Sequence, residues 1–235
     1  MYKSKLAAGL SCIVGAIFVL GVSLPVRAED NATPYPSMAP VDQYLIADRN
    51  AEIALARSAA PESLSRDATI LVLGRHGYET AVEGKNGFVC AVQRSWMGPF
   101  DHPEFWNPKN RSPVCFNPPA VRSVLPGVRK RTELVLAGLP KAQIIEALKA
   151  AYAKKELPAL EPDAMSYMMS KAAYLTDSGG HNLAHLMFFA PLGAKWGQDL
   201  AGSPALTLQT DPVDPFTVLM VPVGKWSEGT SAPIP

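Results

Sequence analysis

The chain of 235 residues contains 22 lysine and arginine residues and 21 aspartate and glutamate residues, which leaves a formal net charge of +1. A chain this close to neutral has no electrostatic basis for binding nucleic acid or anionic membranes, so we expect neither as a partner. With hydrophobic residues at 48% and charged residues at 18%, the length suits one domain with a substantial core.

The N-terminus has the features of a secretory signal peptide over residues 1–28. Lys3 and Lys5 precede a long apolar run, and Val26-Arg27-Ala28 has the small residues of a cleavage site. Retention of the run as a membrane anchor is the alternative, but Pro25 breaks the run and favours cleavage. We therefore expect a secreted or periplasmic protein with no stable membrane insertion after signal cleavage.

The mature chain divides into three parts. Residues 29–40 are polar and rich in proline, which predicts a flexible leader. Residues 41–226 form the predicted domain, and residues 227–235 form a polar tail. The order of helical and strand-like segments predicts a single α+β domain, with a mainly antiparallel sheet built on a central hairpin and covered by three to four helices.

The first part of the domain contains one helix and the most apolar short strand. Residues 43–59 place apolar side chains at helical spacing and end before Pro61, which predicts an amphipathic helix. Residues 69–73, TILVL, are short, β-branched and almost wholly apolar. They predict a central strand that is covered on both faces.

Asn86-Gly87 is the strongest local signal for a hairpin. These two residues tolerate the positive φ angles of a two-residue turn, and they separate the strand-like segments 78–85 and 88–95. The register of this hairpin places Glu79 opposite Arg94. We therefore predict a cross-strand ion pair between them rather than a catalytic acid.

Residues 96–119, here called the aromatic loop, combine large aromatic side chains with six prolines. A connection of this length is usually functional or pinned to the rest of the domain. Trp96, Phe105 and Trp106 are its candidate ligand-binding residues, since aromatic rings can form a recognition surface for a sugar, peptide or lipid. The alternative is a small hydrophobic core beneath a stapled loop.

Cys90 and Cys115 are the two cysteines left after signal cleavage. An exported protein meets an oxidising environment in which an even pair usually bonds, so we predict a disulfide. It would tie the far end of the aromatic loop to the preceding strand. The close C-x-x-C spacing of a redox-active or metal-binding pair is absent.

The second half of the domain alternates helical and strand-like segments. Helices are predicted for residues 120–124, 127–137, 141–155 and 162–176, and strands for residues 183–190, 205–209 and 216–223. The 162–176 helix rests on the recurrence of methionine and alanine at helical spacing.

Asp177, His181 and His185 are the candidate metal ligands, because the three are spaced by four residues each. One carboxylate and two imidazoles suit zinc or non-haem iron, and His76 or His102 could complete the set. A glycine pair interrupts the spacing, so the alternative is a pair of hydrogen-bonded structural histidines.

Several common enzyme signatures are absent from the sequence. There is no phosphate-binding glycine loop, no nucleophile elbow and no haem-attachment motif. The leading functional hypothesis is a non-enzymatic module that binds an unidentified small or polymeric ligand, with no cofactor predicted. The competing hypothesis is a metal-dependent enzyme or metal-binding protein that uses the His181 and His185 region and a divalent metal.

Overall fold

The structure is a computed structural model that describes residues 34–177, 183–197, 202–207 and 213–233. These residues all belong to one compact unit. None of the helices within the described ranges is long and apolar enough to cross a membrane. The predicted signal peptide and His181 lie outside the described residues.

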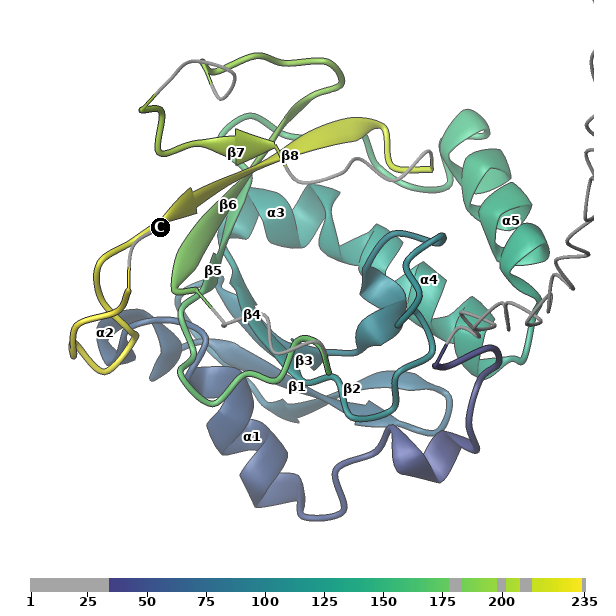
Figure 1. Cartoon of the computed structure of the whole chain (residues 1–235), viewed down its shortest axis with the longest axis horizontal. Coiled ribbons are helices and arrows are strands. Elements are labelled where there is room, and N and C mark those ends of the chain that lie inside the picture. The colour runs from purple at the N-terminus through teal and green to yellow at the C-terminus, as the bar shows by residue number, and fades with distance from the viewer. Residues whose placement is uncertain (1–33, 178–182, 198–201, 208–212, 234–235) are drawn as a thin grey trace, which may run out of the picture. The chain divides into compact units, whose positions relative to one another are not determined.

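One sheet of eight strands forms the centre of the described unit (Figure 1). The strands lie in the spatial order β2, β1, β3, β4, β5, β6, β8, β7. All neighbours are antiparallel except β1 and β3, which are parallel. The bounds are β1 Thr69–Gly74, β2 Gly77–Val82, β3 Val89–Gln93, β4 Ser112–Phe116, β5 Met165–Met168, β6 His185–Pro191, β7 Leu206–Thr207 and β8 Phe216–Pro222.

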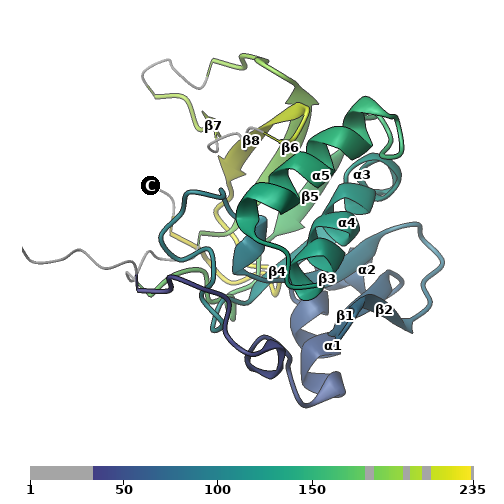
Figure 2. The same cartoon turned by 90° about the vertical axis from the view of Figure 1, so that its right-hand side faces the viewer.

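Helices cover both faces of this sheet, which confirms the predicted α+β class. Their bounds are α1 Arg49–Arg57, α2 Glu62–Ser65, α3 Pro118–Ser123, α4 Leu125–Leu136 and α5 Lys141–Ala153, with short 3-10 turns at Val41–Gln43 and Ser95–Met97. Helix α1 packs on β1, β3 and β4, whereas α3 and α4 lie on the opposite side and α5 packs on α4 (Figures 1 and 2). The helices predicted at 127–137 and 141–155 are confirmed within a few residues.

Alternation along the strands explains this two-sided packing. Ile70 and Val92 point toward α1 and pack with Ala56 and its neighbours, whereas Leu71 and Val114 join the larger core on the side of α4. Successive side chains of a strand point to opposite faces, so an almost continuous apolar run requires cover on both sides. The expectation that TILVL is a doubly covered strand is therefore confirmed.

The predicted hairpin at Asn86-Gly87 is wrong, because β2 and β3 are not neighbours. Strand β2 pairs with β1 instead, through a turn that joins Gly74 and Gly77, and β3 lies on the other side of β1. Residues 83–88 pass the start of β1, where Gly84 donates to the Thr69 hydroxyl at 3.0 Å and Thr69 donates to the Phe88 carbonyl at 2.9 Å. Gly87 has a φ of 78°. The positive φ of Gly87 bends the chain, but local backbone chemistry does not specify which strand a segment pairs with.

The predicted Glu79–Arg94 pair is wrong for the same reason. Glu79 lies opposite Val72 on β1, and Arg94 forms its ion pair with Glu52 of α1.

The predicted helix over residues 162–176 is also wrong, since residues 165–168 form β5 between β4 and β6. Adjacent apolar side chains fit a strand that is covered on both faces as well as they fit a helix. Met168 faces the side of α4, whereas Met169 packs with Trp226 on the other side. Long-range pairing with two strands therefore overrides the helix propensity of methionine.

The aromatic loop contains a strand that was not predicted, β4 at Ser112–Phe116. Proline usually argues against a central strand because it has no N–H to donate. Pro113 lies opposite Val92 of β3, but β5 pairs only with Cys115 and Phe116. No β5 residue therefore needs a donor from Pro113.

The predicted disulfide between Cys90 and Cys115 is confirmed. The two cysteines lie directly opposite each other on β3 and β4, and both are fully buried beneath α1. The bond thus crosslinks neighbouring strands in the core. It ties the far end of the aromatic loop, at Cys115, to the strand that precedes the loop.

Candidate functional site

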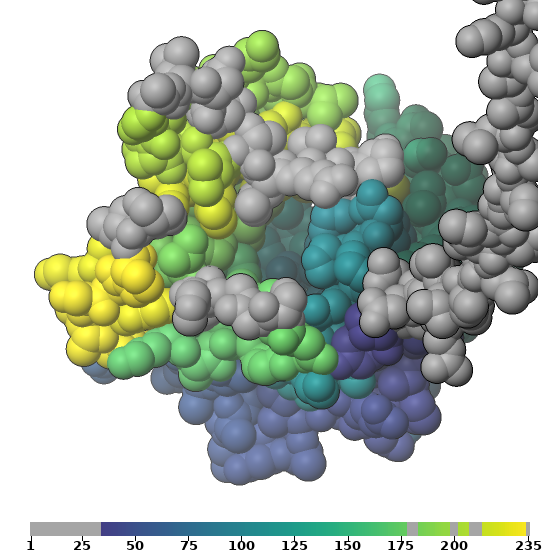
Figure 3. Space-filling model, viewed as in Figure 1, coloured from purple at the N-terminus to yellow at the C-terminus, as the bar shows by residue number. Residues whose placement is uncertain are grey.

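A cavity of about 470 Å³ lies between the sheet and helix α4. The sheet curls from β2 through β5 to β8 around this space, with α3 and α4 beyond it (Figure 1). In the space-filling view a hollow lies beside the teal aromatic loop at the centre of the visible face (Figure 3). The apolar lining includes Met97, Phe116, Val124, Val128, Leu148, Met168, Met187, Phe189, Phe216 and Val218.

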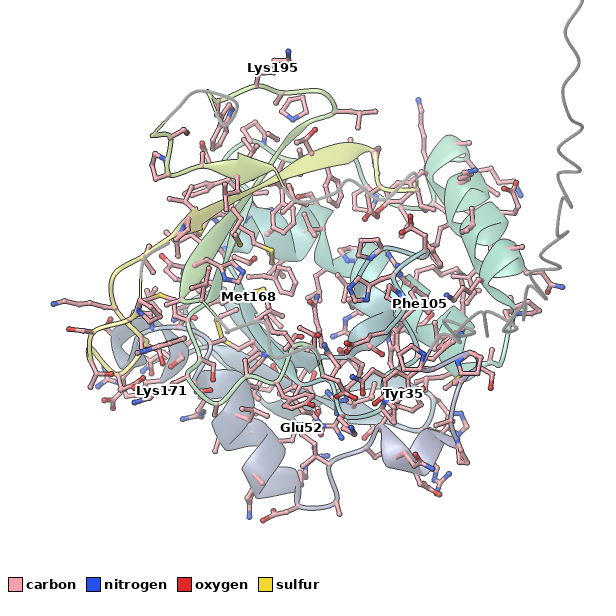
Figure 4. All side chains as sticks on the ribbon, in the orientation of Figure 1. Tyr35, Glu52, Phe105, Met168, Lys171 and Lys195 are labelled. Atoms are coloured by element: carbon pink, nitrogen blue, oxygen red, sulfur yellow. A yellow bond between two sulfur atoms is a disulfide. The ribbon has the colours of Figure 1, made fainter. Side chains whose placement is uncertain are left out.

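Three phenylalanines from three strands form a continuous aromatic part of this apolar wall. The ring centroid of Phe189 lies 6.5 Å from that of Phe116 and 5.4 Å from that of Phe216. Met168, labelled in Figure 4, and Met187 lie beside them on β5 and β6. Methionine side chains are unbranched and adaptable, so this wall can adjust to different apolar shapes.

Polar side chains also line the cavity, and most of them already have hydrogen-bond partners. Ser95 donates to the carbonyl of Phe105 at 2.8 Å, and Ser112 donates to the Asn110 side chain at 2.9 Å. Glu104 accepts from Asn107 and Thr176, each at 2.8 Å. These groups are therefore committed to holding the walls of the cavity together.

Arg94 and Glu52 form a buried ion pair behind the cavity. The Nη2–Oε1 distance is 2.9 Å, and the side chains are 0% and 2% exposed. Arg94 also donates to the Tyr44 carbonyl at 2.7 Å, and Glu52 accepts from the backbone N–H of Leu73 at 3.2 Å. Glu52, labelled in Figure 4, thereby connects α1 to the sheet. Each charge is compensated, as burial requires.

Two cations from the helices hold the aromatic loop over the cavity. Arg131 of α4 donates to the Gly98 carbonyl at 2.6 Å, and its guanidinium carbon lies 4.0 Å from the centroid of the Phe100 ring. Lys141 of α5 donates to the Phe100 carbonyl at 2.9 Å and lies 4.3 Å from the centroid of Phe105. Burial lowers the pKa of the Lys141 ammonium. These hydrogen bonds and cation–π contacts fix the loop to α4 and α5.

The three candidate ligand-binding residues of the aromatic loop are packed inside the protein. Trp96, Phe105 and Trp106 are only 0%, 1% and 7% exposed. Trp96 donates to Thr132 at 3.2 Å, and the rings of Phe105 and Trp106 meet edge-to-face at 4.6 Å. Their burial gives no support to direct ligand contact and matches the alternative of a hydrophobic core beneath the loop. The loop reaches the cavity through other residues, among them Met97, Pro99, His102 and Glu104.

Asp177, one of the candidate metal ligands, is surrounded by hydrogen-bond donors. Its carboxylate accepts from the hydroxyls of Tyr174 and Tyr35, from the ammonium of Lys109 at 2.9 Å and from Asn107 at 3.2 Å. These hydrogen bonds hold the pKa of the Asp177 carboxyl well below its usual range, with Tyr174 contributing most. The carboxylate therefore ties residue 35 of the leader to the aromatic loop.

This arrangement predicts that Asp177 contributes to the stability of the protein against acid. A carboxyl group with a depressed pKa in the folded state contributes stability above its unfolded value of roughly 3.9, and this stability is lost as the pH falls. We expect the wild-type protein to lose more free energy of unfolding than Asp177→Asn between about pH 5 and pH 2. Urea unfolding at several pH values measures this difference. Asp101→Asn, at an exposed position, is the matched control, and equal pH slopes for wild type and Asp177→Asn would refute the role of Asp177.

The candidate histidines lie in different environments. His185 is buried, and its Nδ1 donates to the Leu183 carbonyl at 2.6 Å; burial lowers the pKa of the imidazole. His76 is exposed in the turn between β1 and β2, and His102 is exposed in the aromatic loop, where its Nδ1 accepts from the backbone N–H of Glu104. Among the described residues no group of three histidine, cysteine, aspartate or glutamate side chains is placed to hold a metal ion. Because His181 lies outside them, the metal site stays a prediction.

The cavity includes residues to which the sequence assigned no functional role. Tyr152 of α5 and Gly127 of α4 both line it. Tyr152 lies within the helix predicted at 141–155, and Gly127 is the first residue of the helix predicted at 127–137. Neither position carries a sequence signal that marks a site. No protein-family signature, curated protein or solved structure matches the chain.

Proposed function

We propose that the chain is an exported, non-catalytic protein that binds a small and mostly apolar molecule in the cavity between the sheet and α4. The cavity itself carries this proposal. Its volume of about 470 Å³ falls within the roughly 300–1,000 Å³ of typical small-molecule sites. Its wall of aromatic and methionine side chains, with a few polar groups, has the composition of such a site.

The balance of charges in the lining favours a neutral ligand. Arg94 and Arg131 contribute two positive charges, and Glu104 and Asp214 contribute two negative charges. Since neither sign is in excess, the cavity has no evident preference for an anion or a cation. The buried disulfide supports the proposed secreted or periplasmic location, because such bonds persist in oxidising compartments.

Binding of the neutral apolar dye N-phenyl-1-naphthylamine tests the proposal, since its fluorescence rises in apolar surroundings. We expect saturable binding to the purified protein. Val218→Trp should weaken it at least about tenfold, because Val218 lines the cavity and the larger ring would occupy the space of the dye.

Val221→Trp is the matched control. Val221 lies on the same strand β8 at an odd spacing from Val218, so its side chain points to the opposite face of the sheet. We expect this variant to bind the dye like the wild type. Absence of saturable binding, or equal weakening by both tryptophan variants, would contradict a ligand site in this cavity.

A further inference from the structure

The hydroxyl group of Tyr152 stands out among the polar groups of the cavity. Tyr152 lies near the end of α5, and its side chain lines the cavity. Serine, arginine and glutamate side chains of the lining donate to or accept from neighbouring groups. Within the described parts of the chain, by contrast, the Tyr152 hydroxyl forms no hydrogen bond to another residue. A partly buried phenol without a protein partner is available to a bound molecule.

Gly127 of α4 makes room for this hydroxyl. A Cβ atom at position 127 would lie 2.5 Å from the Tyr152 hydroxyl oxygen, and 3.6 Å from the ring carbon that bears it. The first distance is far too short, whereas the second is an ordinary contact. Gly127 has no positive φ angle that would require glycine, although glycine inside a helix is less favourable than alanine by roughly 0.8–1.0 kcal/mol. Glycine at position 127 therefore leaves the space that the hydroxyl occupies.

The environment keeps the hydroxyl protonated. Burial raises the pKa of the Tyr152 phenol, and Asp214 raises it further while Arg131 opposes the shift. A phenol that stays neutral can donate its proton in a hydrogen bond at any physiological pH. The partner that fits it is an acceptor atom, such as a carbonyl or ether oxygen.

We propose that Tyr152 is the polar anchor of the cavity and donates a hydrogen bond to an acceptor oxygen of the bound molecule. The ligand class is then a neutral molecule with an apolar body against Phe116, Phe189 and Phe216 and one carbonyl or ether oxygen directed toward Gly127. This inference rests on the proposed function, because it assigns a specificity-determining residue to the same cavity.

Two probes that differ at one group test the anchor. 2-Acetylnaphthalene carries a carbonyl group, whereas 2-ethylnaphthalene has a methylene group at the same position and no oxygen atom. The dissociation constants of both are measured by displacement of N-phenyl-1-naphthylamine from wild type and from Tyr152→Phe. We expect the preference for the ketone over the hydrocarbon to fall about fivefold in Tyr152→Phe, the effect of one net hydrogen bond, with hydrocarbon binding unchanged. The ratio of the two dissociation constants is compared between wild type and Tyr152→Phe, because the different hydration of the two probes cancels in this comparison.

Tyr35→Phe is the matched control, because it removes a tyrosine hydroxyl that is bound to Asp177 rather than directed into the cavity. Its ketone preference should equal that of the wild type. If both probes bind and Tyr152→Phe keeps the full preference, the anchor is refuted and the proposed function stands. If neither probe binds the wild type, the proposed function and the anchor fail together.

A stability measurement tests the geometry without any ligand. In the wild-type background, Gly127→Ala forces a Cβ atom against the hydroxyl and should lower the midpoint of urea unfolding. In the Tyr152→Phe background the same substitution meets only the ring at an ordinary distance and should raise the midpoint, because alanine favours the helix. The same sign of effect in both backgrounds would contradict the seating of the hydroxyl over Gly127.

Discussion

We expect substitution of either member of the buried Glu52–Arg94 pair to lower the free energy of unfolding by about 3–5 kcal/mol. Glu52→Leu leaves a fully buried guanidinium without its carboxylate, and Arg94→Met leaves a buried carboxylate without its cation. An uncompensated charge in the core is costly because the interior solvates it poorly. Urea unfolding followed by circular dichroism measures both variants.

The double variant Glu52→Leu, Arg94→Met separates the free-energy cost of a lone buried charge from the loss of side-chain packing. With both charges replaced by apolar side chains, we expect a smaller loss than the sum of the single losses, since neither charge is left behind. The matched control is the exposed pair Asp42–Arg75, whose side chains are 66% and 62% exposed. Asp42→Leu should cost less than about 1 kcal/mol. Single losses at Glu52 and Arg94 as small as this would show that the pair is not a buried stabilising contact.

Loss of the disulfide is the second large effect that we expect. Cys90 and Cys115 are separated by 25 positions, and the chain-entropy relation gives a stabilisation of about 3.5 kcal/mol for a closed loop of this length. The double variant Cys90→Ala, Cys115→Ala should unfold at a correspondingly lower urea concentration. Since typical domains are stable by about 5–15 kcal/mol, a loss of this size is a large share of the net stability.

Reduction of the wild type provides the control for the disulfide prediction. Dithiothreitol should lower the stability of the wild type by a similar amount and should leave the double alanine variant unchanged. If reductant changes both proteins equally, or if the double variant loses less than about 1 kcal/mol, the bond contributes little to stability.

The buried pair and the disulfide both fix β3, which lies beside the cavity, to neighbouring elements. The disulfide joins β3 to β4, and Phe116 follows Cys115 directly on the cavity side. Arg94 follows β3 and connects it to α1 and to the chain before α1. A ligand that binds the folded protein raises its stability by mass action. We therefore expect stability and ligand affinity to be linked in these variants.

Local patterns in the sequence were sufficient to predict those elements whose secondary structure depends mainly on their own residues. The helices at 127–137 and 141–155 were predictable because their periodicity fits a helix that packs on one side. The strand at 69–73 was predictable because a short run of β-branched residues has few alternatives. The disulfide was predictable from the cysteine count and the predicted signal peptide, since only one pairing is left after the predicted cleavage.

Tertiary contacts decided what these local patterns leave open. Residues 165–168 carry a pattern compatible with helix or strand, and pairing with β4 and β6 makes them a strand. Gly87 has a positive φ and lies in a bend between β2 and β3, and only the long-range choice of partner places β1 between these two strands. The burial of Trp96, Phe105 and Trp106 depends on α4 and α5, which lie far along the chain.

The cavity is the feature that depends most completely on tertiary structure. Its lining comes from β4, β5, β6, β8, α4, α5 and the aromatic loop, and no segment of the sequence contains enough of these residues to mark a site. Tyr152 and Gly127 are separated by 25 positions in the chain and meet only because α5 packs on α4. The composition and the periodicity of the sequence determined that the class would be α+β and that the strand at 69–73 would be covered on both faces. The packing of distant elements decided which buried residues enclose a space, because a cavity remains only where the side chains of packed elements leave a volume unfilled.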